Sequence, residues 1–182
     1  MEKTDLTKFD NSWYRPGTFI RRGLWYFVNI FFFKSSLPVP NGIKKSLLKL
    51  FGAKLGKRIL IKPSVNIKYP WFLKIGNDVW IGEDVWIDNL SMVYLGNNVV
   101  ISQGAFLFTG NHNYKKTGFD LLLKDIVVED GVWIGAGSMI VPGIRMGNHS
   151  VAGAGSVITE NTLPYSIYSG NPAKFVRRRE IS

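Results

Sequence analysis

The chain has 182 residues, of which 23 are Lys or Arg and 13 are Asp or Glu, so its formal net charge is +10. There is no cysteine, which excludes a disulfide framework, a zinc–thiolate site and a cysteine nucleophile. The positive charge favours an anionic partner (nucleic acid, a membrane surface or a phosphorylated ligand), or it serves solubility alone.

The amino-terminal segment contains one apolar run, residues 24–33, which reads LWYFVNIFFF. A membrane-spanning helix needs about 20 residues, so this run is too short to cross. Its basic flanks, Arg21, Arg22 and Lys34, favour a helix lying in the membrane interface. The alternative is a helix packed against its own protein. Residues 1–11 are polar and partly acidic, unlike a secretory signal, so we expect a cytoplasmic protein. If the apolar run lies in the interface, the protein is peripheral at the inner face of the membrane.

A second helix is predicted near residues 43–51, which completes a basic, aromatic and partly helical segment over residues 1–54. Its apolar side chains fall on one helical face, its lysines fall elsewhere, and a glycine follows as a C-terminal cap. The apolar residues are Ile43, Leu47, Leu48 and Phe51, the lysines are Lys44, Lys45 and Lys49, and the capping glycine is Gly52.

Between residues 55 and 163 aliphatic residues recur at six-residue intervals, in runs that begin at Leu55, Ile75, Leu95 and Val128. The positions are Leu55, Ile61, Ile67, Ile75, Ile81, Ile87, Leu95, Ile101, Leu107, Val128, Ile134, Ile140, Met146, Ala152 and Ile158. A small or β-branched residue usually follows four positions later. A period of six fits a short strand and a turn, three of which complete one coil. We therefore predict a mainly β protein, a parallel β-helix whose stacked coils bury one another.

The same repeat predicts the coil length and one interruption. Leu55, Ile75 and Leu95 are 20 residues apart, whereas Val128 and Met146 are 18 apart. Between residues 109 and 127 the pattern lapses, which predicts a loop that leaves the stack. Loops held by rigid scaffolds often carry function.

His112 lies in this loop and is the candidate general base, because imidazole titrates near neutral pH. Counting back 20 residues from Phe108 and Thr109 places Asp88 and Asn89 one coil below, about 4.8 Å away. There they would orient the histidine or bind substrate hydroxyls. The alternatives are a surface histidine and ordinary turn residues.

The carboxyl-terminal residues 164–182 are predicted to form a basic tail or a short helix. Gly170, Asn171 and Pro172 end the repeat, and Lys174 begins a cluster that includes Arg177. Such a cluster would bind phosphates, or it is a solvated terminus.

Four segments, IGNDVWIGEDVWIDNL, TGNHNY, DGVWIGAGSMIVPGIRMGNHSVAGAGSVIT and YSGNPAKFVRRR, resemble the hexapeptide-repeat acyltransferases. The likeness covers nearly the whole chain and is closest to the O-acetyltransferases of colanic acid and exopolysaccharide biosynthesis. It implies a left-handed helix, a homotrimer with active sites between subunits, acetyl-CoA as co-substrate and no metal. It also implies no nucleic-acid partner.

The resemblance also implies roles for individual residues. His112 would deprotonate the acceptor hydroxyl, with Asp88, Asn89 and Asn111 binding the acceptor. The remaining expected contacts are to the coenzyme, with Trp133, Gly135, Ala136, Ala154 and Thr159 along its pantetheine arm and Lys174 and Arg177 at its phosphates. A backbone N–H near Gly135 would serve as oxyanion donor. Two departures from the family pattern are Glu160, where Lys is frequent, and Asp125, where Pro is usual.

The predicted function is therefore acetyl-CoA-dependent O-acetylation of a sugar hydroxyl, on a sugar or lipid-linked oligosaccharide acceptor, in surface or exopolysaccharide biosynthesis. The acceptor can be nucleotide-linked, lipid-linked or polymeric. The alternatives are an amino-sugar N-acetyltransferase, a small-molecule O-acetyltransferase such as one acting on serine, and a non-catalytic β-helix scaffold. A zinc hydratase on the same scaffold is disfavoured, because the chain has only two histidines, His112 and His149.

Overall fold

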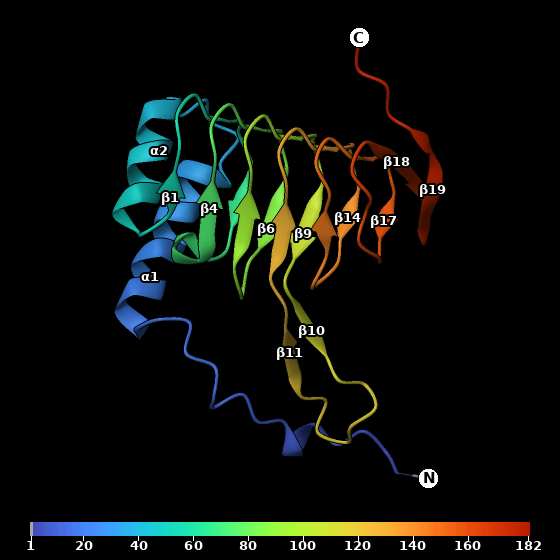
Figure 1. Cartoon of the computed structure of the whole chain (residues 1–182). Coiled ribbons are helices and arrows are strands. Elements are labelled where there is room, and N and C mark those ends of the chain that lie inside the picture. Colours follow the sequence, from blue (N-terminus) through green and yellow to red (C-terminus); the bar gives the residue numbers. More distant parts are fainter. Residues whose placement is uncertain (1) are drawn as a thin grey trace.

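The computed structural model describes residues 2–182 and shows a three-sided stack of parallel coils with two helices at one end (Figure 1). The predicted parallel β-helix is confirmed. Its three faces are parallel sheets, apart from one antiparallel strand at the end of the second face.

The first face consists of β1 (Lys54–Leu55), β4 (Leu73–Ile75), β7 (Val93–Leu95), β12 (Ile126–Val128) and β15 (Arg145–Met146). The second face consists of β2 (Leu60–Ile61), β5 (Trp80–Ile81), β8 (Val100–Ile101), β13 (Trp133–Ile134), β16 (Val151–Ala152), β18 (Ser166–Gly170) and β19 (Ala173–Arg178). The third face consists of β3 (Asn66–Ile67), β6 (Trp86–Asp88), β9 (Phe106–Phe108), β14 (Met139–Ile140) and β17 (Val157–Ile158).

The six-residue repeat forms the core. Every aliphatic position of the repeat is buried except Leu55, which is partly exposed in the first coil. Pairing follows the predicted spacing, since Leu55 aligns with Ile75 and Ile75 with Leu95, while Val128 aligns with Met146. Leu95 aligns directly with Val128, so the interrupting loop leaves the stack without breaking it.

Close stacking explains the glycines that follow the aliphatic positions. A Cβ on Gly76 would lie 2.6 Å from the carbonyl oxygen of Gly96 in the next coil. Real Cβ atoms do not approach that closely, so any side chain there would push the coils apart.

The amino-terminal helices cap the first coil. Helix α1 (Phe19–Val28) continues into the π-helix η2 (Asn29–Phe33), and α2 (Asn41–Leu50) follows. Trp25, Asn29 and Phe33 are buried on one side of this segment, which confirms the packed-helix interpretation for that side. The other side is exposed and apolar, and includes Phe27 and Phe31. No helix within residues 2–182 combines the length and apolar character that crossing a membrane requires.

One lysine of α2 does not lie where the helical pattern placed it. Lys44 is buried, and its Nζ donates hydrogen bonds to the carbonyls of Ile61 (3.3 Å) and Lys62 (2.8 Å). Burial lowers the pKa of Lys44. The cation thus satisfies carbonyls at the open end of the stack, where no further coil exists to pair with them. Gly52 caps the helix with a φ of +98°, as predicted.

The predicted C-terminal helix is wrong. The chain instead forms an antiparallel hairpin, β18 and β19, which extends the second face beyond β16. A helix here would leave the backbone groups along the edge of β18 unpaired, whereas β19 pairs with them. Phe175 of β19 also packs edge-on against Tyr168 of β18, with ring centroids 6.0 Å apart.

Candidate functional site

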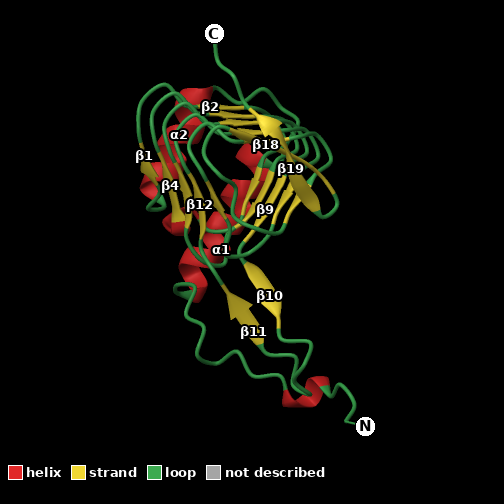
Figure 2. Ribbon diagram, turned by 45° about the vertical axis from the view of Figure 1, so that its right-hand side comes forward, coloured by secondary structure: helices red, strands yellow, loops and turns green. Residues whose placement is uncertain are grey.

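The interrupting loop is a β-hairpin that projects from the stack (Figures 1 and 2). Strand β10 (Gly110–His112) pairs antiparallel with β11 (Leu121–Leu123), and His112 lies opposite Leu121. The chain therefore leaves the stack in an ordered ladder, and it has rejoined the stack at Ile126, which already pairs with Val93 in β12. His112 is the last residue of its strand, which holds its backbone in place.

The imidazole of His112 is oriented by Phe119. Its Nδ1 lies 2.8 Å from the carbonyl oxygen of Phe119, and the two rings stack with centroids 4.5 Å apart and planes 9° apart. Because a carbonyl only accepts hydrogen bonds, Nδ1 must carry the proton in the neutral ring. The lone pair then lies on Nε2, which is the atom available to accept a proton.

The amino-terminal arm, residues 2–16, runs beside this hairpin (Figure 2). The N–H of Asp5 donates to the carbonyl of Thr117 (2.9 Å), and the ring of Phe9 lies 5.8 Å from that of His112. Further along, the hydroxyl of Tyr14 donates to the carbonyl of Leu90 (2.7 Å). Sequence reasoning missed this arm, because its polar composition contains no repeat and no motif.

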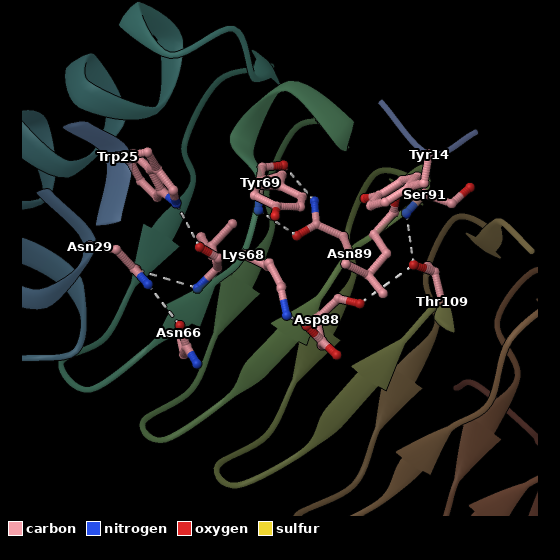
Figure 3. Close-up of polar contacts among 12 residues, drawn as sticks. Tyr14, Trp25, Asn29, Asn66, Lys68, Tyr69, Asp88, Asn89, Ser91 and Thr109 are labelled. Atoms are coloured by element: carbon pink, nitrogen blue, oxygen red, sulfur yellow. Dashed lines mark hydrogen bonds and ion pairs between the residues drawn. The ribbon is translucent and has the colours of Figure 1, made fainter. Parts of the chain in front are cut away.

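Asp88 lies where the coil register predicted it, aligned with Phe108 one coil away. Its Oδ1 is 3.2 Å from Nζ of Lys68, and it accepts no hydrogen bond with good geometry within residues 2–182. Thr109, which leads into the hairpin, donates its N–H to the backbone carbonyl of Asp88 (3.2 Å). The Asp88 carboxylate therefore lies beside the Lys68 ammonium, while its backbone contacts the residue that leads into the hairpin (Figure 3).

Asn89 also lies in the predicted coil, but it is fully buried. Its carboxamide accepts from the N–H of Tyr69 (3.0 Å) and donates to the carbonyl of Tyr69 (2.7 Å), so it braces two coils (Figure 3). The carboxamide could bind a hydroxyl of the acceptor substrate only by breaking both hydrogen bonds to Tyr69. Asn111 is exposed beside His112, and its Oδ1 accepts the N–H of His112 (2.8 Å).

The corner between the second and third faces carries four of the residues expected to contact the coenzyme, Trp133, Gly135, Ala136 and Ala154. Thr159 instead directly follows β17 at the far end of the third face, and β19 carries Lys174 and Arg177. Trp133 is half-exposed, and its indole N–H donates to Oγ of Ser102 (3.0 Å). Ala136 and Ala154 lie in neighbouring coils, because Gly155 donates its N–H to the carbonyl of Ala136 (2.8 Å). The turns that carry Ala136 and Ala154 are therefore adjacent along the stack.

Two details at this corner differ from expectation. The N–H of Gly135 donates to the carbonyl of Ala152 (2.8 Å), so it is not free to stabilise an oxyanion. Lys174 of β19 does not stand free, because its Nζ lies 3.2 Å from Oε1 of Glu160, next to Thr159. Arg177 is exposed on the same strand.

Comparisons with known proteins identify the family of the chain. The hexapeptide repeat of succinyl-transferases matches residues 125–160. The acetyltransferase WcaF of Escherichia coli strain K12, which is named for colanic acid biosynthesis, is 36% identical over 166 residues, covering 91% of each chain. The chain belongs to the hexapeptide-repeat acetyltransferases. The predicted family is thereby confirmed, and membership makes the protein an acetyltransferase.

More distant relatives support the same assignment. The galactoside O-acetyltransferase of Escherichia coli strain K12 is 30% identical over 149 residues, covering 80% of this chain and 73% of its own. A galactoside acetyltransferase solved in complex with coenzyme A has a TM-score of 0.77 at 25% identity, covering 88% and 82% of the two chains. A maltose O-acetyltransferase from Clostridium difficile 630 shares the fold, with a TM-score of 0.81 at 23% identity over 89% and 88% of the chains.

Proposed function

We propose that the protein transfers an acetyl group from acetyl-CoA to a sugar hydroxyl in surface or exopolysaccharide biosynthesis, with His112 as general base. The observation that carries this proposal is the hydrogen bond from Nδ1 of His112 to the carbonyl of Phe119. It leaves Nε2 as the proton acceptor, which an alcohol requires before it can attack a thioester. By family membership we also infer that the coil is left-handed.

The proposed reaction is a direct transfer. Nε2 of His112 takes the proton as the acceptor oxygen forms a bond to the thioester carbonyl carbon. The tetrahedral intermediate then collapses, the carbon–sulfur bond breaks, and the CoA sulfur leaves with the proton returned by His112. Asp88 and Asn111 are proposed to bind acceptor hydroxyls, whereas the buried carboxamide of Asn89 supports the coil beneath them.

The test is acetyl transfer by the purified protein, followed as CoA release and as acetylated product by mass spectrometry. Free sugars, amino sugars and serine are tested as acceptors. The acceptor that becomes acetylated distinguishes sugar O-acetylation, N-acetylation and small-molecule O-acetylation. Surface polysaccharide from cells with and without the protein identifies the product. A protein that neither binds acetyl-CoA nor releases CoA with any acceptor would contradict the proposal and favour a scaffold.

For the coenzyme we propose contacts from Trp133, Gly135, Ala136, Ala154 and Thr159 to the pantetheine arm. Lys174 and Arg177 are proposed to bind its phosphates. Support comes from the shared corner that carries Trp133, Ala136 and Ala154, and from the galactoside acetyltransferase solved in complex with coenzyme A.

The pair formed by Glu160 and Lys174 makes this assignment testable. Lys174→Ala plus Arg177→Ala should raise the KM for acetyl-CoA by roughly tenfold, which is the loss expected from about 1.4 kcal/mol of binding. Glu160→Gln should lower that KM by up to about fivefold, because it releases Lys174 from an exposed ion pair. Steady-state kinetics at low and high salt would show both effects shrinking with salt. An unchanged KM in both variants at low salt would reject the assignment.

The outward side chains of the stack support a homotrimer. The second face exposes Trp80 and Trp133, and on the third face Trp86 stacks on Phe106 with centroids 4.7 Å apart. The first face instead presents charged residues, including Arg145. Two adjacent apolar faces need covering, and a ring of three copies would cover them. Analytical ultracentrifugation checks this proposal.

We also propose that α1 and η2 rest on the inner surface of the membrane. Their exposed side carries Phe19, Leu24, Phe27 and Phe31, close to basic residues of the same segment. Lys44 of α2 is buried and takes no part in this attraction. Liposome co-sedimentation should show binding that needs anionic lipid and weakens with salt, because each nearby cation adds about 1 kcal/mol. Phe27→Ser plus Phe31→Ser should abolish liposome binding. If this variant sedimented with liposomes as much as the wild type does, the exposed side of α1 and η2 would not be the membrane-binding surface.

A further inference from the structure

Two adjoining cavities lie beside the first coils of the third face. The first, of about 410 Å³, lies between α1, η2 and strand β3 and is also lined by Trp86. The second, of about 380 Å³, lies beside the amino-terminal arm. Both are lined by Arg22, Lys68 and Tyr69, so they form one groove.

The groove is strongly cationic. Arg22, Lys34 and Lys68 line the first cavity, Arg15 lines the second, and neither lining contains Asp or Glu. Asp88 lies 3.2 Å from Lys68 and balances one of these four charges, which leaves three. Such a density of like charge is stabilised when an anion binds between the cations.

Arg22 is the least satisfied of the four cations. Its Nε is buried and has no hydrogen-bond partner within residues 2–182, and its guanidinium forms no ion pair there. A buried guanidinium N–H without a partner is costly, so this side chain is the centre of the candidate site. Its planar fork matches the oxygens of a phosphate.

The groove comes within one cross-strand neighbour of the candidate base. Leu121 lines the second cavity and lies directly opposite His112 in the hairpin, where cross-strand side chains are about 5 Å apart. Burial raises the pKa of Tyr14, the charges of Tyr69 and Asp88 raise it further, and the charge of Arg22 lowers it, so these groups lie close together at the groove. Figure 3 shows Tyr14, Tyr69 and Asp88 at the same part of the third face.

We infer that this groove binds the diphosphate of an acceptor whose sugar is carried as a sugar diphosphate, with the sugar directed toward His112. The inference rests on the proposed acetyl transfer and specifies its substrate class. Three unbalanced positive charges match a diphosphate better than a single carboxylate. The aromatic walls, Phe19, Tyr26 and Trp86, would cover apolar parts of the same molecule.

The binding test uses inorganic pyrophosphate and isothermal titration calorimetry on the full chain. Arg22→Gln should weaken pyrophosphate binding by at least about tenfold, while Lys49→Gln on α2 removes the same charge outside the groove and should leave it unchanged. Because Arg22 is half-buried, Arg15→Gln plus Lys34→Gln, both exposed, is a second variant expected to weaken binding similarly. Lys174→Ala plus Arg177→Ala should retain it, which separates the groove from the proposed CoA phosphate site. Equal affinity in the wild type and both groove variants would overturn the inference.

Competition experiments identify the molecule that carries the diphosphate. A nucleoside diphosphate sugar and a prenyl diphosphate sugar are each titrated against pyrophosphate, and displacement by either one supports the inference and identifies the carrier. Displacement by neither overturns it. Acetylation of a free sugar is measured in parallel, because normal CoA release without pyrophosphate binding would reject the groove while leaving the proposed function intact.

Discussion

Replacing His112 with alanine is expected to lower kcat at least about 10²-fold, while the affinity for acetyl-CoA changes little. A positioned general base typically contributes about 10²–10⁴ in rate, and the neutral ring presents Nε2 because Nδ1 is held by Phe119. Acetyl-CoA affinity should persist because the proposed coenzyme contacts lie along the corner of the coil stack rather than on the hairpin. The measurements are single-turnover acetyl transfer and equilibrium binding of acetyl-CoA.

The chain offers a matched control for this substitution. His149 is the other histidine, and it lies in a turn of the stack with its ring 4.7 Å from that of Tyr165. His149→Ala should therefore keep nearly full turnover. If His112→Ala behaved like His149→Ala, another group would have to accept the proton.

Trp25→Ala is expected to lower the free energy of unfolding by about 3–5 kcal/mol, the usual loss for a large buried aromatic. Trp25 is 2% exposed, packs against Phe33 and Phe51 with centroids 5.3 and 5.2 Å away, and donates its indole N–H to the carbonyl of Ile67 (2.8 Å). The substitution would leave a cavity and a buried carbonyl without its donor. Urea unfolding followed by far-UV circular dichroism measures the loss.

The neighbouring Tyr26 provides the comparison, since it is 61% exposed on the same helix. Tyr26→Ala should change the free energy of unfolding by less than about 0.5 kcal/mol. Similar losses in the two variants would mean that α1 does not seal the end of the stack. A large difference would show that the aromatic run has one structural side and one side free for other contacts.

The repeat by itself determined the coil stack. Inward side chains at Ile75 and Leu95 must align if each coil is to bury the next, so the spacing of the apolar residues dictates the register. The same arithmetic placed Asp88 beside Phe108 and showed where the chain must leave the stack. These features depend on local pattern and on one repeated contact, which is why the sequence alone reveals them.

Only the tertiary structure decided which groups are free to act. Nδ1 of His112 is hydrogen-bonded to the backbone carbonyl of Phe119, and Lys174 forms an ion pair with Glu160. The carboxamide of Asn89 is hydrogen-bonded to the backbone of Tyr69. It also decided that the carboxyl end pairs as a hairpin instead of forming a helix. Each of these outcomes depends on single hydrogen bonds or ion pairs between segments that no periodic pattern relates, so their geometry exists only once the chain is folded.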